Sequence, residues 1–522
     1  MSPRPVTWRQ RCQGLQGGYR SSRQEPLGRN QVAVVEGAGV PATPEVAAHD
    51  GELRPPAAVK FFYSVGQVVE SGYIAVNGFV FFYYTAVLGL SGSMVGAAVA
   101  ISMCLDAAFD PIIGSWSDSV RSKYGRRLPL MLIGAPLTMV SMGLLFAPPS
   151  ALTPFMLFLW LTVTKMAVRA FASVFNIPFF ALGGEMADGY AERSRIAGYR
   201  LLGGIVVTVA ITAVAYSVFF AGKGGLQRPE NYPAFGWTIA ALVLVGGLIS
   251  CAGIWRYAAS LPQPTTRPEP MARRLVGEMA EIFRNPSFRI LFLSMVVFAS
   301  AAGAHAALNN HNYVFVWKLR PEMIQFMTYA SLVGITIGVP VTPILLRRLE
   351  KKTVVALGFA LLIVGWTLLP VVRASGVFAP AGLEALPWLL ATQLVVGLGL
   401  GLVYIAYPSM MADAAEEHEY LFGHRREGLY FSGLGFAGKA AAGVGTMVGG
   451  FALDILRFPH ELARQPDAVI DESVLVGLVL AWGPFCSALC VLGALIFAPY
   501  AITRVRHAEI MTALRRTRAA AP

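Results

Sequence analysis

Long apolar stretches separated by short polar breaks run along the chain from Ala57 almost to Ile502. A helix that spans a bilayer needs about 20 mostly apolar residues, and stretches of that kind recur about twelve times here. We expect the spans at 57–88, 93–116, 128–147, 153–182, 196–220, 232–257, 288–316, 322–346, 353–372, 385–412, 429–456 and 474–503. The pattern therefore predicts an all-α membrane protein with twelve transmembrane helices.

One polar break is much longer than the others and divides the predicted helices into two sets of six. It covers 258–287 and is basic and rich in proline. A short basic turn follows the second span of each set, which indicates a weak internal repeat of the kind found in many transporters. We therefore expect two pseudo-symmetric six-helix bundles joined by a linker. The predicted parts are a disordered tail at 1–56, bundles at 57–257 and 288–503, the linker between them and a basic tail at 504–522.

The composition excludes a soluble protein, because 55% of the 522 residues are hydrophobic and only 14% are charged. The net charge is +12, but the basic residues gather in alternate breaks, such as 121–127, 267–289 and 504–518. This distribution argues against a nucleic-acid partner and follows the positive-inside rule. It predicts that the linker and both termini are cytoplasmic. We expect a multi-pass monomer in the cytoplasmic (inner) membrane, surrounded by the lipid bilayer.

Neither the cysteines nor the histidines predict a structural metal site. Four of the five cysteines lie inside apolar stretches without zinc-type spacing, so we expect them to be packing residues. His418 and His424 lie in a strongly charged segment, for which we expect an ion-pair network at a gate instead of metal ligands. The first 56 residues are neither a signal peptide nor a span, and whether they belong to the natural protein stays open.

Ionisable residues inside the apolar stretches are the main functional signal, because a charge at the bilayer centre costs roughly 2.5 to 3.5 kcal/mol. Glu70 lies near the middle of the first span. It shares one helix face with Tyr63, Gln67, Tyr73 and Asn77. Two roles fit Glu70: a structural carboxylate paired with a basic residue on another helix, or an acceptor for the hydroxyl groups of a solute.

The second span carries Asp106 and Asp110, which are four residues apart and therefore lie on one helix face. Two carboxylates so placed repel each other in a low dielectric, so the pair favours binding a cation or holding a proton. The alternative is a charge-paired helix end. That alternative is weakened because Asp110 precedes Pro111 inside the span.

The fourth span carries Lys165, Arg169 and Asn176 on one face. These cations could neutralise the carboxylates of the first two spans, or they could receive an acidic substrate. Arg200 on the fifth span and Lys439 on the eleventh add further positive charge. The interior then holds three acids against four bases, which favours a substrate that bears an anionic group.

Polar residues of the C-terminal set are more ambiguous. His305 and Asn309 share a face of the seventh span, where a histidine is either a proton relay or a structural hydrogen-bonding group. Tyr404 and Tyr407 on the tenth span are either platforms for a sugar ring or core tyrosines.

Four stretches together resemble the glycoside-pentoside-hexuronide:cation symporter family, the melibiose-permease-like branch of the major facilitator superfamily. They are Phe82–Ser91, Asp106–Gly114, Phe175–Leu182, and Arg425–Gly428 followed by Lys439. The resemblance runs from about Val59 to Thr503 and leaves out only the two tails. It implies the major facilitator fold and the coupled uptake of a sugar or related polar solute with H⁺ or Na⁺.

The resemblance also implies roles for individual residues. Asp106, Asp110 and Ser173 match the family's coupling-cation site, while Glu70, Asn176 and Arg200 match its sugar-binding residues. The full predicted substrate set adds Tyr73, Lys165, Arg169, His305, Asn309, Tyr404 and Lys439. The predicted gating motif comprises Gly114, Asp118, Arg121, Gly125, Arg126 and Arg127, which resemble the facilitator loop pattern.

Departures from the family pattern bear on the ion and the solute. Phe109 stands where sodium-using members have an asparagine, so proton coupling is favoured over Na⁺. Asn176 stands where melibiose permease has an aspartate, and Lys165 with Arg169 has no counterpart there. These changes argue against a neutral galactoside and leave a uronide, a sulfonated or phosphorylated sugar, or a lysophospholipid.

Three other functions are alternatives to sugar symport. A lysophospholipid symporter would have the same fold. A multispan enzyme would need a nucleophile with a base or a metal-binding motif, and the sequence contains no such arrangement, so we expect no enzyme and no cofactor beyond the coupling ion. A nutrient sensor that does not transport would share every feature above. The sequence names neither the solute nor the oligomeric state.

Overall fold

The computed structural model describes residues 53–261, 281–424, 426–465 and 469–520. Among these residues, twelve helices are long and apolar enough to cross a membrane, as predicted, and there is no strand. The predicted tail at 1–56 and linker at 258–287 lie largely outside the described residues, as does Arg425, so those predictions stay untested.

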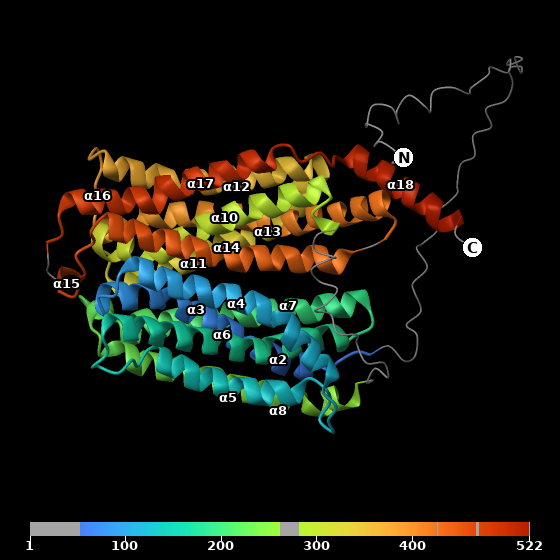
Figure 1. Cartoon of the computed structure of the whole chain (residues 1–522), viewed down its shortest axis with the longest axis horizontal. Coiled ribbons are helices and arrows are strands. Elements are labelled where there is room, and N and C mark those ends of the chain that lie inside the picture. The colour runs from blue at the N-terminus through green and yellow to red at the C-terminus, as the bar shows by residue number, and fades with distance from the viewer. Residues whose placement is uncertain (1–52, 262–280, 425, 466–468, 521–522) are drawn as a thin grey trace, which may run out of the picture. The chain divides into compact units, whose positions relative to one another are not determined.

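The spans of the first half are α2 (Ala57–Val65) with α3 (Val68–Phe82) and η1 (Tyr83–Val87), α4 (Gly92–Ser119), α5 (Leu128–Leu145), α6 (Pro154–Glu185), α7 (Tyr190–Val214) with η2 (Ala215–Phe219), and α8 (Asn231–Ser260). Those of the second half are α10 (Pro286–His311) with η4 (Asn312–Val316), α11 (Pro321–Arg348), α12 (Lys351–Ala374), α13 (Leu386–Phe422), α14 (Glu427–Ile455), and α16 (Glu472–Leu480) with η6 (Ala481–Phe485) and α17 (Cys486–Phe497). Two further helices, α15 (His460–Ala463) and α18 (Arg504–Ala520), lie outside the spans (Figure 1).

Local sequence explains where several helices begin and end. Proline occupies the first helical position of α6, α10 and α11, where its missing N–H needs no partner. The side chain of Asn285 accepts hydrogen bonds from the backbone N–H groups of Ser287 and Phe288 and so caps α10. Gly423 ends α13 in the left-handed conformation, with φ of 82°.

The first span is interrupted at Gly66, between α2 and α3. A Cβ atom at this position would lie 2.5 Å from the ring of Phe179 on α6 and 2.6 Å from Oγ of Ser250 on α8. Glycine therefore lets three helices approach one another just before the polar face that carries Glu70.

Two helical segments were not predicted from the apolar pattern. The helix α13 was expected to end at residue 412 but continues to Phe422, and the basic tail from residue 504 forms α18. Ion pairs hold these polar segments, including Arg518 to Glu419 at 2.7 Å, while Ile510 and Leu514 of α18 are buried. Hydropathy detects helices that face lipid, and it misses helices stabilised by charge pairs.

The two halves meet most closely at the end of the molecule that carries α15, which we call the α15 end. There α4 packs along α14, with Gly92 and Gly450 so close that a Cβ on either would collide with the other's backbone. The side chain of Asp454 accepts hydrogen bonds from the N–H of Gly92 at 2.7 Å and of Ser93 at 2.9 Å. A hydrogen bond of 2.9 Å also joins Thr85 to His311. The halves are therefore held together at this end.

Candidate solute and cation site

Charged and polar side chains from four helices meet inside the span region. Helix spacing explains the convergence, because residues three, four or seven positions apart share one helix face. The helices α3 and α4 supply the acids, α6 supplies two cations with two neutral groups, and α14 supplies one lysine. The members are Glu70, Tyr73 and Asn77; Asp106 and Asp110; Lys165, Arg169, Ser173 and Asn176; and Lys439. We call this set the polar cluster.

The two aspartates on α4 share their partners. The Ser173 hydroxyl lies 3.0 Å from a carboxylate oxygen of Asp106 and 3.0 Å from one of Asp110. The Lys439 ammonium lies 3.0 Å from the other oxygen of Asp106 and also pairs with Asp110. The carboxylates predicted to repel each other are thus bridged by one hydroxyl and one cation. That cation comes from the other half of the molecule.

Arg169 links the aspartates to the acid on the first span. Its Nε lies 2.7 Å from Asp106 and its Nη1 lies 3.7 Å from Glu70. Its guanidinium also lies over the Tyr73 ring, 4.8 Å from the centroid. Asp106 and Arg169 are both buried, and removing one partner of a buried pair leaves an uncompensated charge. These contacts favour a structural role for part of the predicted set, beside its predicted role in binding.

Glu70 and Asn176 form a second link between α3 and α6. The Asn176 amide donates a hydrogen bond of 2.6 Å to the Glu70 carboxylate. The Asn176 carbonyl oxygen is buried, and within the described part of the chain it accepts no hydrogen bond. Buried polar atoms are nearly always hydrogen-bonded, so this oxygen is suited to receive a donor from a ligand.

Lys165 is fully buried, and its ammonium donates to Asn77 and, at 3.4 Å, to the Tyr73 hydroxyl. The ammonium also lies 5.0 Å from the Tyr73 ring centroid. Across residues 53–261, 281–424, 426–465 and 469–520, it makes no ion pair within 4.0 Å. Its hydrogen-bond partners are thus neutral oxygens, and the Arg169 guanidinium lies over the same Tyr73 ring. A buried cation without a carboxylate partner is electrostatically prepared for an anion.

Arg200 lies apart from the polar cluster. It lines a cavity of about 290 Å³ together with Gln67, Ser71 and Thr208, and Leu332 of the second half closes one side. The guanidinium lies over the Phe180 ring at 4.9 Å. Gln67 immediately precedes α3 and Ser71 follows Glu70 on that helix, so the cavity lies beside the polar cluster.

The predicted residues of the second half, except Lys439, also lie apart from the polar cluster. His305 is stacked between Trp366 and Trp482, and its Nδ1 is 2.8 Å from the Trp482 carbonyl oxygen. Asn309 accepts a hydrogen bond of 2.7 Å from the Trp482 indole. Tyr404 is 55% exposed. One polar atom of His305 and one of Asn309 are therefore hydrogen-bonded within their own half, which favours the structural interpretation.

The predicted gating motif forms an ion-pair network at the opposite end from α15. Arg127 lies 2.6 Å from both Asp118 and Glu185, and Arg126 also pairs with Glu185 at 2.6 Å. Gly125 adopts φ of 86°, which lets the turn reach these partners. Arg121 is exposed and Gly114 lies within α4. Sequence reasoning missed Glu185, because a single acid at a helix end carries no signal until the fold places it.

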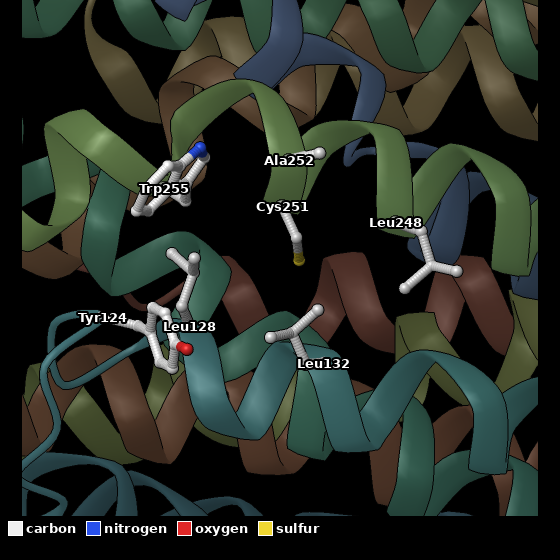
Figure 2. A pocket seen from close by; sticks show the side chains of 7 residues that line it. All are labelled: Tyr124, Leu128, Leu132, Leu248, Cys251, Ala252 and Trp255. Carbon is white, nitrogen blue, oxygen red and sulfur yellow. The ribbon is translucent and has the colours of Figure 1, made fainter.

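A second cavity of about 420 Å³ lies between α5 and α8 (Figure 2). It is lined by Tyr124, Leu128, Leu132, Leu248, Cys251, Ala252 and Trp255. None of these side chains carries a charge, so the cavity offers little to a polar solute. The polar cluster is therefore the better candidate for solute and ion binding.

The chain as a whole is similar to known transport proteins. The sequence profile of the family described as MFS/sugar transport protein matches residues 58–504. The glucuronide carrier protein homolog of Escherichia coli (strain K12) is 22% identical over 432 residues, which cover 80% of this chain and 88% of that protein. The isoprimeverose transporter of Lactiplantibacillus pentosus is 25% identical, with 78% and 82% covered. The putative sulfoquinovose importer of Salmonella typhimurium (strain LT2) is 23% identical, with 76% and 80% covered.

Solved structures share the fold at lower identity. A crystal structure of the peptide transporter POT in complex with sulfate has a TM-score of 0.60 at 15% identity, with 85% of this chain and 94% of that chain covered. The crystal structure of the nucleoside transporter NupG has a TM-score of 0.54 at 16% identity, with 84% and 98% covered. At this identity the similarity establishes the arrangement of the helices and nothing finer.

Proposed function

The chain belongs to the MFS/sugar transport protein family, and from that premise we propose that it is a proton-coupled symporter for a sugar or glycoside that carries an anionic group. It is accordingly a multi-pass membrane transporter and not an enzyme. The observation that carries the proposal is Lys165: it is a fully buried cation that makes no ion pair with any described residue, whereas the other charges of the polar cluster are paired.

Charge balance in the polar cluster supports an anionic solute. Three carboxylates, Glu70, Asp106 and Asp110, face three cations, and Arg200 stands in the neighbouring cavity. Protonating one aspartate would leave the cluster with a net positive charge, which an anionic group would neutralise. Among the similar proteins are a glucuronide carrier homolog and a putative sulfoquinovose importer, whose named sugars bear a carboxylate and a sulfonate.

The contacts of the aspartates support a proton as the coupling ion. A hydroxyl carries one hydrogen, so Ser173 can donate to only one of the two carboxylates at a time, and a proton on the other would complete both contacts. The Lys439 ammonium already stands between the carboxylates, where Na⁺ would have to displace it. The Asp110 side chain is 29% exposed and that of Asp106 1%, so Asp110 is the accessible acceptor.

Protonation of Asp110 would act on the contact between the halves. Lys439 belongs to α14 and Asp110 to α4, and these are the helices along which the halves pack. Neutralising Asp110 weakens the ion pair and lowers the cost of separating the two helices. Coupling then follows because the proton and the solute favour the same arrangement of the halves.

The proposed orientation has both termini in the cytoplasm, in agreement with the basic residues at the end opposite α15. In that orientation the structure represents the state closed toward the outside. The membrane would be a bacterial inner membrane, as for the similar symporter described as an inner membrane protein of Escherichia coli (strain K12).

Uptake into proteoliposomes tests the proposal. Purified protein would be reconstituted, and a pH gradient or a Na⁺ gradient would be imposed with the membrane potential clamped. We expect a glucuronide or sulfoquinovose to accumulate with an inward proton gradient and not with Na⁺ alone. Accumulation of a neutral glycoside, with no competition by either anionic sugar, would overturn the assignment of the solute class. Absence of any uptake would favour the nutrient sensor.

A lysophospholipid remains the second candidate, favoured by the cavity around Arg200. That cavity combines one cation with apolar side chains, and Leu201 beside it is 62% exposed. A lysolipid headgroup at Arg200 and its chain along Leu201 would match this mixture. Competition between a short-chain lysophospholipid and the anionic sugar for uptake distinguishes the two classes.

A further inference from the structure

Three potential metal ligands converge at the end of the molecule opposite α15, within the second half. They are Glu281, just before α10, His418, near the end of α13, and His424, just after that helix. One carboxylate oxygen and one ring nitrogen from each histidine all lie within 4.8 Å of one another. None of the three belongs to the polar cluster or to the gating motif.

His418 is the unusual member of this group. Its side chain is fully buried, and in the part of the chain that the structure describes neither ring nitrogen makes a hydrogen bond. Its Nε2 lies 3.6 Å from the Glu281 carboxylate, while Phe422 and Tyr430 surround the ring at centroid distances of 4.6 and 5.6 Å. Buried polar groups are nearly always hydrogen-bonded, so the Nε2 of His418 is suited to receive a further partner.

The backbone and the neighbouring aromatic rings fix the three side chains. Gly423, in the left-handed conformation, turns the chain so that His424 contacts Glu281, and the two imidazole rings lie 5.8 Å apart. Next to Glu281, Phe283 packs edge-on against Phe288, which in turn packs against Tyr430. The fold therefore fixes the positions of all three side chains.

The carboxylate of Glu281 is ready to act as a ligand. Its contacts are with the imidazole rings of His418 and His424 and with the guanidinium of Arg426. The guanidinium of Arg426 lies 3.8 Å from the second carboxylate oxygen, whereas the first oxygen faces both histidines.

We propose that Glu281, His418 and His424 form a binding site for Zn²⁺. Two imidazole nitrogens and one carboxylate oxygen are a donor set that Zn²⁺ accepts, with water in a fourth position. Ligand atoms around a tetrahedral Zn²⁺ are separated by about 3.3 Å, close to the distance between His418 and Glu281. The ion would replace the direct contact between His424 and Glu281. The sequence predicts only ion pairs here, and the unsatisfied imidazole is what changes the assignment.

A second group of potential ligands provides the contrast. Asp413, Glu416 and His507 also bring their ligand atoms within 4.8 Å of one another. There the Lys351 ammonium lies 2.7 Å from both oxygens of Asp413, and His507 is hydrogen-bonded to Glu416 at 2.6 Å. An ammonium already fills the position that an ion would take, so this group is an ion-pair network and a matched control.

Zinc at the proposed site would tie together three segments of the second half. Glu281 ends the segment that joins the two halves, His418 belongs to α13, and His424 precedes α14. The helix α14 also carries Lys439, the partner of the α4 aspartates. The ion would therefore stabilise the position of α14 relative to α10 and α13, whichever solute is transported.

The test uses the purified full-length protein, freed of metal with a chelator and titrated with ZnCl₂. We expect one bound Zn²⁺ per chain by elemental analysis, and an increase in the unfolding temperature as the site fills. His424→Gln and Glu281→Gln should each weaken binding by about tenfold or more. His507→Gln should bind like the wild type. His424 lies on a loop and is half-exposed, so its substitution should not prevent folding.

Co²⁺ provides a spectroscopic check on the ligands. Bound in place of Zn²⁺ by two histidines and a carboxylate, it should give visible absorption bands that disappear in His424→Gln and persist in His507→Gln. Binding that is absent from the wild type, or that survives both His424→Gln and Glu281→Gln, would overturn the proposal. Loss of binding in His507→Gln alone would move the site to the control group and contradict the assignment.

Discussion

The polar residues predicted for the site have different surroundings in the two halves of the molecule. In the first half, Lys165 is buried and makes no ion pair with the residues that the structure describes, and none of them donates a hydrogen bond to the Asn176 carbonyl oxygen. In the second half, His305 and Asn309 both hydrogen-bond to Trp482. The predicted site residues of the first half thus include unsatisfied groups, whereas His305 and Asn309 each have a partner in their own half.

This difference indicates that two halves with the same helix arrangement can have different roles in binding. Unsatisfied polar groups cost folding free energy, so they are retained where a ligand compensates them. The second half contributes one residue, Lys439, to the polar cluster, and that residue contacts the acid pair of the first half. The proposed division is that the first half binds the solute and the proton, whereas the second half responds to protonation of Asp110 through Lys439. The predictions below test that division.

The largest effect is expected for Asp110→Asn. The amide cannot take up a proton at neutral pH, so proton binding no longer changes the contact with Lys439. Accumulation against a gradient should fall to a ratio of about one, because coupling requires an ion-dependent state. Exchange of solute between equal concentrations should remain measurable. Undiminished accumulation in this variant would contradict the coupling role.

A large but selective effect is expected for Lys165→Met. The substitution keeps the length of the side chain and removes the charge that faces the proposed anion. A hydrogen bond to a charged group contributes about 1.5 to 3 kcal/mol, so affinity for an anionic sugar should fall about 10- to 150-fold. Affinity for a neutral glycoside should change little. Isothermal titration with both solutes measures the difference, and equal losses would argue for a structural role.

A smaller effect is expected for Arg200→Ala. The guanidinium lines a cavity beside the polar cluster and lies over Phe180, without an ion pair among the described residues. A partly solvated charge contributes about 1 kcal/mol or less, so solute affinity should weaken by about fivefold at most. An unchanged dissociation constant would exclude Arg200 from the site. A loss restricted to lysolipids would favour the second candidate solute.

Most of the fold could be predicted because lipid imposes a simple pattern. The twelve apolar stretches correspond to the twelve spans, with ends that differ by a few residues at most positions. The exceptions, α18 and the extension of α13 to Phe422, are polar helices held by contacts such as Arg518 with Glu419. Those contacts depend on tertiary proximity, which a hydropathy pattern does not contain.

The members of the polar cluster could be predicted, but their pairing could not. Helix periodicity places Asp106, Asp110 and Arg169 on inward faces. Which acid meets which base depends on the rotation and depth of each helix. The sequence also gave no sign that Lys165 would lie between Tyr73 and Asn77 without a carboxylate. His418 carried no signal for the same reason, because its burial follows from the packing of Phe422 and Tyr430.

The smallest effect on transport is expected for His305→Gln, which tests the second half directly. Glutamine can keep a hydrogen bond to the Trp482 carbonyl but loses the stacking between Trp366 and Trp482. We expect a lower unfolding temperature, because such aromatic contacts contribute about 0.5 to 1.5 kcal/mol each. The pH profile of uptake should match that of the wild type. A displaced profile would make His305 a proton relay and would give the second half a share of the coupling chemistry.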